Sequence, residues 1–235
     1  MLSRLFRAAL DLLYPPCCVI CREPGETLCA ACREKAPLVG EIRCQVCSAP
    51  FEGLIDGPFT CADCEERQFH FTCAVATRRN SHTVREFIHE FKYNRKLALA
   101  KPLANWLAET LDDPRLLEPA CDRLVPVPLH HVRRRERGFN QALVLARLLS
   151  KQSGIPVADC LKRTRYTTSQ TGFNRAARME NLRGAFQMRQ HHDVRNLHLL
   201  LIDDVLTTGS TVEECSKILL RAGAASVRVA TVARA

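Results

Sequence analysis

The segment 199–211, Leu-Leu-Leu-Ile-Asp-Asp-Val-Leu-Thr-Thr-Gly-Ser-Thr, places the tightest constraint on the fold of this chain. Four apolar residues end in two adjacent acids, and a short run of hydroxyl-bearing residues around Gly209 follows. Val212, Cys215 and Leu219 then recur at the spacing of a helical face. The pattern predicts a buried strand, a loop and a helix, the repeating unit of α/β proteins with a parallel sheet.

The loop between this strand and this helix has the chemistry of a phosphate site. Successive backbone N–H groups and hydroxyls at a helix N-terminus attract an anion, and the helix dipole adds to the attraction. Asp203 and Asp204 would repel the same phosphate, so we expect them to face ribose hydroxyls or a magnesium ion. The alternative is a polar turn in which Asp204 or Thr208 caps the helix. A cap needs one such residue, whereas this segment holds an ordered set, which favours the phosphate site.

All thirteen positions of 199–211 resemble the PRPP-binding motif of type I phosphoribosyltransferases, an apolar strand followed by two acids and Thr-Thr-Gly-Ser/Thr-Thr. The resemblance implies that Asp203 and Asp204 hold the 2′- and 3′-hydroxyls of the ribose, that the loop wraps the 5′-phosphate, and that magnesium accompanies PRPP. The implied binding residues are Asp203, Asp204, Val205, Thr207, Thr208, Gly209, Ser210 and Thr211.

Four Cys-x-x-Cys pairs lie between residues 17 and 64. A two-residue gap lets two thiolates converge on one ion, and two such pairs complete a tetrahedral zinc site. Consecutive pairing would make two small ribbons, whereas a crossed arrangement would interleave them. Short links and turns with Pro or Gly favour consecutive pairing, and Cys17 could replace Cys18. The eight candidate ligands are Cys18, Cys21, Cys29, Cys32, Cys44, Cys47, Cys61 and Cys64.

Both zinc sites are expected to be structural. Four sulfur ligands leave no open position for water, and a module of about fifty residues has too little core to fold well without metal. A thiol redox role is the alternative for a single Cys-x-x-Cys pair, but that chemistry does not need four pairs in tandem. The remaining lone cysteines are expected to be small core residues: Cys73, Cys121, Cys160 and Cys215.

The chain is expected to have three parts: an amphipathic helix at 1–16, a double zinc-ribbon module at 17–72 and an α/β domain at 73–235. Residues 1–72 carry 7 Lys/Arg against 10 Asp/Glu, whereas the rest carries 27 against 15. The basic part therefore holds the phosphate loop, which suits a phosphorylated sugar, a nucleotide or nucleic acid.

The N-terminus predicts neither export nor a membrane span. Arg4, Arg7 and Asp11 interrupt its apolar residues, and no apolar run in the chain approaches a spanning length of about 18 residues. We therefore expect a reducing cytoplasm, where clustered cysteines more often bind metal than each other.

The α/β domain is expected to alternate strands and helices. Thr83 and Glu86 have the spacing of a capping box, which predicts a helix start. The other expected elements are strands at 73–80, 124–129 and 227–232 and helices at 84–91, 97–107 and 140–150.

Residues 130–141 are expected to form a dense basic loop after strand 124–129. In the order of elements of a type I phosphoribosyltransferase, the pyrophosphate-binding loop belongs here. Arg133, Arg137 and the backbone of Gly138 are therefore candidates for contacting pyrophosphate or a nucleic-acid phosphate, and Arg137 joins the two acids as a candidate catalytic residue. A solvated charge run is the alternative, but the carboxyl end of a core strand favours a binding role.

Residues 162–189 carry 7 basic side chains and 1 acid between two expected core strands. A polar stretch of this length is rarely only a connection. It resembles the flexible hood that closes over the active site of phosphoribosyltransferases. The candidate contact residues are Gln170, Arg175, Arg178 and Asn181.

Four further segments, together with the cysteine pairs, resemble the ComF family of bacterial competence and DNA-utilisation proteins, including its GntX-like members. They are Val-Pro-Val-Pro-Leu at 125–129, Arg-Gly-Phe-Asn-Gln at 137–141, Thr-Ser-Gln at 168–170 and Arg-Met-Glu-Asn-Leu-Arg-Gly-Ala-Phe at 178–186. The resemblance covers nearly the whole chain. It implies zinc ribbons fused to a phosphoribosyltransferase domain and a role in handling incoming DNA, which composition and spacing alone do not indicate.

Two classes of function remain open. An enzyme would bind PRPP and magnesium at 203–211 and transfer the phosphoribosyl group with release of pyrophosphate, although no base-recognition pocket is identifiable. A binding module would sense PRPP or a nucleotide and bind single-stranded DNA beside other DNA-uptake proteins, with Phe139, Tyr166 and Phe173 available to stack on bases. A zinc-held scaffold is a third hypothesis, and the intact phosphate loop argues against it.

Overall fold

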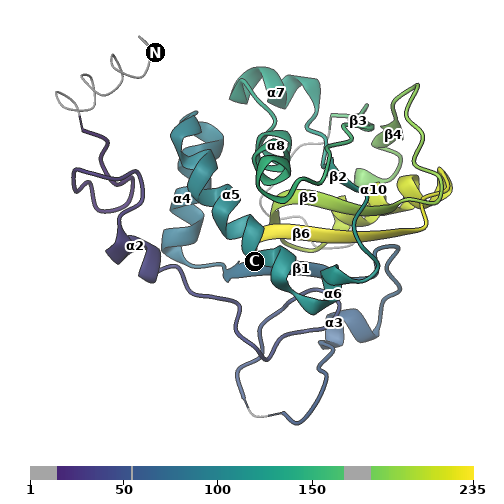
Figure 1. Ribbon diagram of the computed structural model, residues 1–235, viewed down its shortest axis with the longest axis horizontal. Coiled ribbons are helices and arrows are strands. Elements are labelled where there is room, and N and C mark those ends of the chain that lie inside the picture. The colour runs from purple at the N-terminus through teal and green to yellow at the C-terminus, as the bar shows by residue number, and fades with distance from the viewer. Residues whose placement is uncertain (1–14, 54, 167–180) are drawn as a thin grey trace.

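The computed structural model describes residues 15–53, 55–166 and 181–235 (Figure 1). Most of the helix expected at 1–16 lies outside the described residues. So do the segment 168–170 and the hood candidates Gln170, Arg175 and Arg178. Among the described residues, no helix combines the length and hydrophobicity needed to span a bilayer.

A four-stranded parallel sheet forms the centre of the protein, in the order β1-β6-β5-β2 (Figure 1). Its strands are β1 (Ala74–Arg79), β2 (Arg123–Pro126), β5 (His198–Leu206) and β6 (Ser226–Arg234). The parallel-sheet prediction is confirmed. β2 stops earlier than the expected strand 124–129, because Pro126 and Pro128 cannot donate ladder hydrogen bonds.

Helices cover both faces of the sheet, and the alternation of side chains along β5 shows which face each helix meets. Leu200 and Ile202 belong to one core cluster with residues of α4 (His82–Tyr93), α5 (Ala100–Ala108) and α8 (Gln141–Ser153). Leu199 and Leu201 belong to a second cluster with α10 (Ser210–Arg221). A short 3₁₀ turn, η1 (Leu97–Leu99), leads into α5.

Two local predictions were wrong. The capping box at Thr83 is not the helix start, because Ser81 Oγ accepts the Val84 N–H at 3.2 Å and Thr83 is buried inside α4. The basic stretch expected to be a loop is instead a short helix, α7 (His131–Arg137), which ends at Gly138 with a φ of 83°. A left-handed residue at a helix end favours glycine, which explains the stop.

Two short strands not expected from the sequence are β3 (Leu161–Arg163) and β4 (Phe186–Met188). They pair as an antiparallel sheet, with Arg163 opposite Phe186. The two ends of the basic segment 162–189 therefore lie beside each other.

The cysteine region packs against the α/β domain through both of its halves, the first on the α4 and α5 face of the sheet and the second on the α10 face. It contains α2 (Ala30–Glu34) and α3 (Ala62–Glu65), which lie in separate parts of the molecule in Figure 1. Between α5 and β2, the 3₁₀ turn η2 (Glu109–Asp112) leads into α6 (Pro114–Leu117). Arg115 of α6 donates to the carbonyl oxygens of Cys44 at 3.2 Å and Gln45 at 2.9 Å, which anchors the loop that carries the third cysteine pair.

The lone cysteines lie where a small apolar residue is expected. Cys73, Cys160 and Cys215 are buried in the two core clusters, and Cys121 is half-buried against one of them.

Candidate functional site

The two adjacent acids lie at the carboxyl end of β5, on opposite faces of the strand. Asp204 faces the α4 side, where its side chain is 4% exposed and its Oδ2 lies 2.6 Å from Lys92 Nζ. Asp203 faces the α10 side. Its Oδ1 accepts the N–H of Asp204 at 2.9 Å. The strand therefore presents one carboxylate to each layer of helices.

The pKa of Asp203 is raised well above the usual value for an aspartic acid. Burial raises the pKa of this carboxyl to about 8, and the negative charge of Asp204 adds to the rise, although Lys92 opposes it. Two adjacent carboxylates in a buried site cannot both ionise at low cost, so one retains its proton near neutral pH.

A second cation, Arg163 of β3, lies near Asp203. Burial lowers the pKa of the Arg163 guanidinium, Arg133 reinforces the effect, and Cys215 and Asp203 oppose it. Its Cζ also lies 5.3 Å from the centre of the Phe186 ring. Because arginine stays protonated in proteins, Arg163 is a fixed positive charge beside Asp203.

The phosphate loop has the predicted strand, loop and helix arrangement. Thr207, Thr208 and Gly209 connect β5 to α10, and Gly209 has a φ of 75° at the helix N-cap. Thr208 Oγ1 and Ser210 Oγ lie 2.9 Å apart, so one hydroxyl donates to the other. The first N–H groups of a helix have no intrahelical acceptor, so the start of α10 favours an anion, although the Ser210 N–H also makes a long contact of 3.5 Å with Thr208 Oγ1.

α7 brings its arginines to the end of α4. Arg137 Nη2 donates to Tyr93 Oη at 3.0 Å, and its guanidinium lies over the same ring at 4.8 Å. Tyr93 directly follows Lys92, which contacts Asp204, so Arg137 contacts the same end of α4 that carries Lys92. Arg133 is near Arg163 and lies 6.0 Å from the centre of the Tyr166 ring.

The backbone of Gly138, expected to contact a phosphate, makes a hydrogen bond within the protein. Its N–H donates to the Arg134 carbonyl oxygen at 2.8 Å and closes the end of α7, so this N–H is already used within the protein. Phe139, one of the expected stacking residues, packs against the core with its ring 5.1 Å from that of Phe91. Phe173 lies outside the described residues.

Lys92, Tyr93 and Arg163 are site residues that the motif analysis did not identify. The segment 92–96, Lys-Tyr-Asn-Arg-Lys, interrupts an apolar helical stripe and carries a weak signal of its own. No sequence pattern indicated a role for Arg163, because its approach to Asp203 depends on the pairing of β3 with β4.

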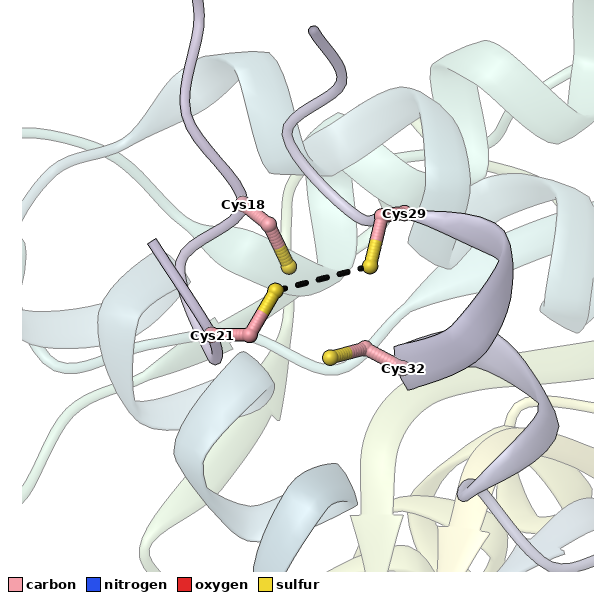
Figure 2. A group of neighbouring side chains, drawn as sticks. All are labelled: Cys18, Cys21, Cys29 and Cys32. Atoms are coloured by element: carbon pink, nitrogen blue, oxygen red, sulfur yellow. Dashed lines mark hydrogen bonds between the residues drawn. The ribbon is translucent and has the colours of Figure 1, made fainter. Parts of the chain in front are cut away.

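The eight paired cysteines form two clusters with consecutive pairing. Cys18, Cys21, Cys29 and Cys32 make the first cluster, whose sulfurs point toward one centre (Figure 2). Cys44, Cys47, Cys61 and Cys64 make the second. Within each, the sulfurs all lie within 4.8 Å of one another. Cys17 is exposed, with its Sγ 3.5 Å from the Pro15 carbonyl oxygen, and belongs to neither cluster.

The geometry of both clusters fits zinc. Four thiolates at about 2.3 Å in a tetrahedron place neighbouring sulfurs about 3.8 Å apart, whereas a disulfide would bring two of them to about 2.05 Å. The observed separations are 3.6 Å for Cys21 and Cys29 and 3.7 Å for Cys47 and Cys61. A hydrogen bond from Cys47 lowers the pKa of Cys44 despite burial, which favours the thiolate that a metal ion needs.

Comparison with known proteins finds two domain families, each matching a different part of the chain. Residues 139–235 match the phosphoribosyl transferase domain, and residues 9–66 match the double zinc ribbon domain. "DNA utilization protein YhgH" of Escherichia coli strain K12 is 32% identical over 225 residues, which cover 93% of this chain and 96% of the relative.

Two competence proteins are also similar. "Competence protein F" of Haemophilus influenzae is 34% identical over 152 residues, covering 63% of this chain and 66% of the relative. "Competence protein ComFC" of Bacillus subtilis is 26% identical over 226 residues, covering 90% and 86%. With a parallel α/β domain and two Cys₄ clusters, the chain belongs to the ComF/YhgH family of competence and DNA-utilisation proteins, in which a double zinc ribbon precedes a phosphoribosyltransferase domain.

Proposed function

We propose that this protein binds PRPP with magnesium at residues 203–211 and acts in DNA uptake or utilisation. The observation that carries the proposal is the direct succession of two adjacent acids, the half-buried Asp203 and the buried Asp204, the turn at Gly209 and the N-terminus of α10, with Lys92 beside Asp204. This combination supplies acceptors for sugar hydroxyls and donors for a phosphate within a few residues.

The ribose would lie against the end of β5. Asp203 and Asp204 accept hydrogen bonds from its 2′- and 3′-hydroxyls, and the loop 207–211 donates to the 5′-phosphate. Lys92 holds Asp204 in place at 2.6 Å, which fixes one of the two acceptors before the sugar arrives.

The pyrophosphate would face the basic residues around the acids. Arg137 of α7 and Arg163 of β3 supply guanidinium groups, whose planar donors suit phosphate oxygens. Magnesium bound with the pyrophosphate would neutralise part of its charge.

If an acceptor is present, the same geometry supports transfer. A bond forms between C1 of the ribose and the acceptor nucleophile, the bond from C1 to the pyrophosphate oxygen breaks, and pyrophosphate leaves with the electron pair. The fixed cations stabilise the charge that develops on pyrophosphate. We propose PRPP binding as the core function because the acceptor has no identified pocket.

Calorimetric titration of PRPP with magnesium tests the binding. The double variant Asp203→Asn/Asp204→Asn should lose at least about 100-fold in affinity, because it removes the charged acceptor and the carboxyl beside it. Asp193→Asn is the control, since Asp193 pairs with Arg195 on the exposed surface. Zinc analysis of each variant reports the state of the ribbons. Equal affinity of wild type and double variant would refute the proposal. Pyrophosphate release with nucleobases then tests for turnover.

A second function, single-stranded DNA binding, is supported by two exposed aromatic residues beside α7. Tyr93 is 52% exposed and Tyr166 is 43% exposed, and each lies next to an arginine of α7. Bases can stack on such rings while arginines contact phosphates. Fluorescence anisotropy with an oligothymidylate at two salt concentrations tests this function. Tyr93→Ala/Tyr166→Ala should weaken DNA binding more than Leu97→Ala does. Leu97 is the control because it is exposed like the two tyrosines but has no ring on which a base could stack.

A further inference from the structure

The second cysteine cluster lies directly behind the phosphate loop. Cys47 and Cys64 line a small cavity together with Arg67 and the segment 206–209. The first cluster is situated differently, since Cys18 and Cys32 belong to the core on the α4 and α5 face of the sheet. Within the part of the chain that the structure describes, the second metal site is therefore the one that adjoins the phosphate loop.

One guanidinium joins the second cluster to the loop. Arg234, at the end of β6, donates through Nη1 to the carbonyl oxygens of Thr207 at 2.9 Å and Leu206 at 3.2 Å. Its Nη2 lies 3.7 Å from Cys47 Sγ. Metal ligands are commonly oriented by such neighbouring hydrogen bonds. Arg234 thus contacts a metal ligand on one side and the loop backbone on the other.

A second arginine holds the next carbonyl of the loop. Arg67 Nη1 donates to the Thr208 carbonyl oxygen at 3.3 Å, and its guanidinium lies over the Phe69 ring at 4.3 Å. Phe69 also closes the space behind Gly209, where a Cβ would lie 3.8 Å from its ring. Arg67 follows Cys64 by three residues, so this contact also starts from the second ribbon.

The same segment is attached to the start of α10. The His70 N–H donates to Glu213 Oε2 at 2.8 Å, and His70 Nδ1 lies 2.7 Å from Glu213 Oε1. Glu213 is buried in the first turn of the helix. The contacts from residues 67–70 and from Arg234 therefore surround the loop from behind.

These contacts fix the direction of the loop N–H groups. In a trans peptide the carbonyl oxygen and the following N–H point in opposite directions. Arg234 holds the Thr207 carbonyl on the ribbon side, so the Thr208 N–H points to the other side. Arg67 holds the Thr208 carbonyl in the same way, so the Gly209 N–H also points away from the ribbon. Hydrogen bonding at the carbonyl also polarises the peptide and makes its N–H a better donor.

We propose that the second Cys₄ site, through Arg234 and Arg67 as positioning residues, holds the phosphate loop in the conformation that binds the 5′-phosphate. This inference rests on the proposed PRPP site and adds a metal dependence to it. Metal bound by Cys44, Cys47, Cys61 and Cys64 fixes the ribbon surface that carries Arg67 and that Arg234 contacts through Cys47. Metal in the first cluster has no such effect on the loop.

A matched pair of cysteine variants separates the two metal sites. Cys29 and Cys61 occupy the same position in the two ribbons, each half-buried at the N-cap of the short helices α2 and α3. Cys29→Ser and Cys61→Ser should each remove one zinc per chain. Hydrogen exchange at 206–211 should rise about tenfold in Cys61→Ser and stay within about twofold of wild type in Cys29→Ser. The affinity for PRPP should follow the same pattern.

Arginine variants test the positioning role without touching a cysteine. Arg234→Met should retain both zinc ions, speed exchange in the loop and weaken PRPP binding about tenfold, whereas Arg234→Lys, which can still reach one carbonyl, should recover part of the loss. Arg79→Met is the matched control, because Arg79 is the register partner of Arg234 on β1 but pairs with exposed Glu52.

The outcomes distinguish this inference from the proposed function. If wild type does not bind PRPP, the proposed function fails. Hydrogen exchange at 206–211 still tests whether the second metal site fixes the conformation of the loop. Equal exchange at 206–211 in Cys29→Ser and Cys61→Ser would overturn the inference. Should Cys61→Ser fail to fold, unchanged loop exchange in Arg234→Met would overturn it instead.

Discussion

Lys92 Nζ lies 2.6 Å from Asp204 Oδ2, and this pair connects the last turn of α4 to the carboxyl end of β5. Both side chains are largely buried, so the attraction between them is only weakly screened by water. The pair holds the Asp204 side chain in place before any ligand binds.

Removal of Lys92 should therefore destabilise the protein. Lys92→Met leaves the Asp204 carboxylate buried without its cation, which should lower the free energy of unfolding by about 2–4 kcal/mol in urea denaturation. The double variant Lys92→Met/Asp204→Asn should recover most of this loss. Arg195→Met is the control, since Arg195 and Asp193 form an exposed pair whose loss should cost less than about 1 kcal/mol. Equal losses in Lys92→Met and Arg195→Met would contradict the assignment.

The raised pKa of Asp203 predicts a pH dependence of stability. A carboxyl with a pKa of about 8 in the folded state and an ordinary value when unfolded stabilises the fold while it is protonated, and this contribution is lost as the pH rises toward 8. The free energy of unfolding of wild type should fall by about 1–3 kcal/mol between about pH 6 and about pH 8, and that of Asp203→Asn should fall much less.

Thermal unfolding at the two pH values gives the comparison, with each kcal/mol expected to shift the Tm by about 2–4 °C. At about pH 6 the cysteine clusters should retain metal, so the difference between wild type and Asp203→Asn isolates this carboxyl. A parallel pH profile for the two proteins would show that Asp203 titrates normally.

Arg137 should contribute more to PRPP binding than the other arginines of α7. It is buried and held by Tyr93 at 3.0 Å, whereas Arg134 on the same helix is exposed. Arg137→Lys keeps the charge but loses the planar donor pair, so the Kd for PRPP should rise about tenfold. Arg134→Lys should leave the Kd within about twofold. Calorimetry measures both, and a larger effect at Arg134 would reverse the assignment.

Metal content should separate Cys18 from its neighbour Cys17. Cys18 is buried in the first cluster, and Cys17 is exposed outside it. Plasma emission spectrometry should find two zinc ions per chain in wild type and in Cys17→Ser, and one in Cys18→Ser. A loss of zinc on substitution of Cys17 would mean that Cys17 is the ligand. Chelation of both ions should also lower the Tm, because metal binding supplies folding free energy.

The parts of the fold that depend on short stretches of sequence could be predicted. The apolar run before Asp203, the glycine at 209 and the spacing of Val212 and Cys215 give the strand, the turn and the helix locally. The same holds for the paired cysteines, because a two-residue gap already specifies a metal knuckle, and short links favoured consecutive pairing.

The rest of the site depends on contacts between distant residues. Lys92 meets Asp204 across more than a hundred residues of sequence, and Arg163 reaches Asp203 only because β3 pairs with β4. The basic stretch before Gly138 was predicted as a loop because charge suggested exposure, but arginine is also a good helix former. At the start of α4, two hydroxyl residues competed for the cap, and Ser81 rather than Thr83 occupies it.

Because Asp203 faces the α10 layer and Asp204 faces the α4 layer, a sugar bound across the end of β5 would contact both halves of the sandwich. Its binding energy would then be shared between the packing units on the two faces of the sheet. Saturation with PRPP should therefore make the α/β domain unfold more cooperatively, with slower exchange deep in both helical layers.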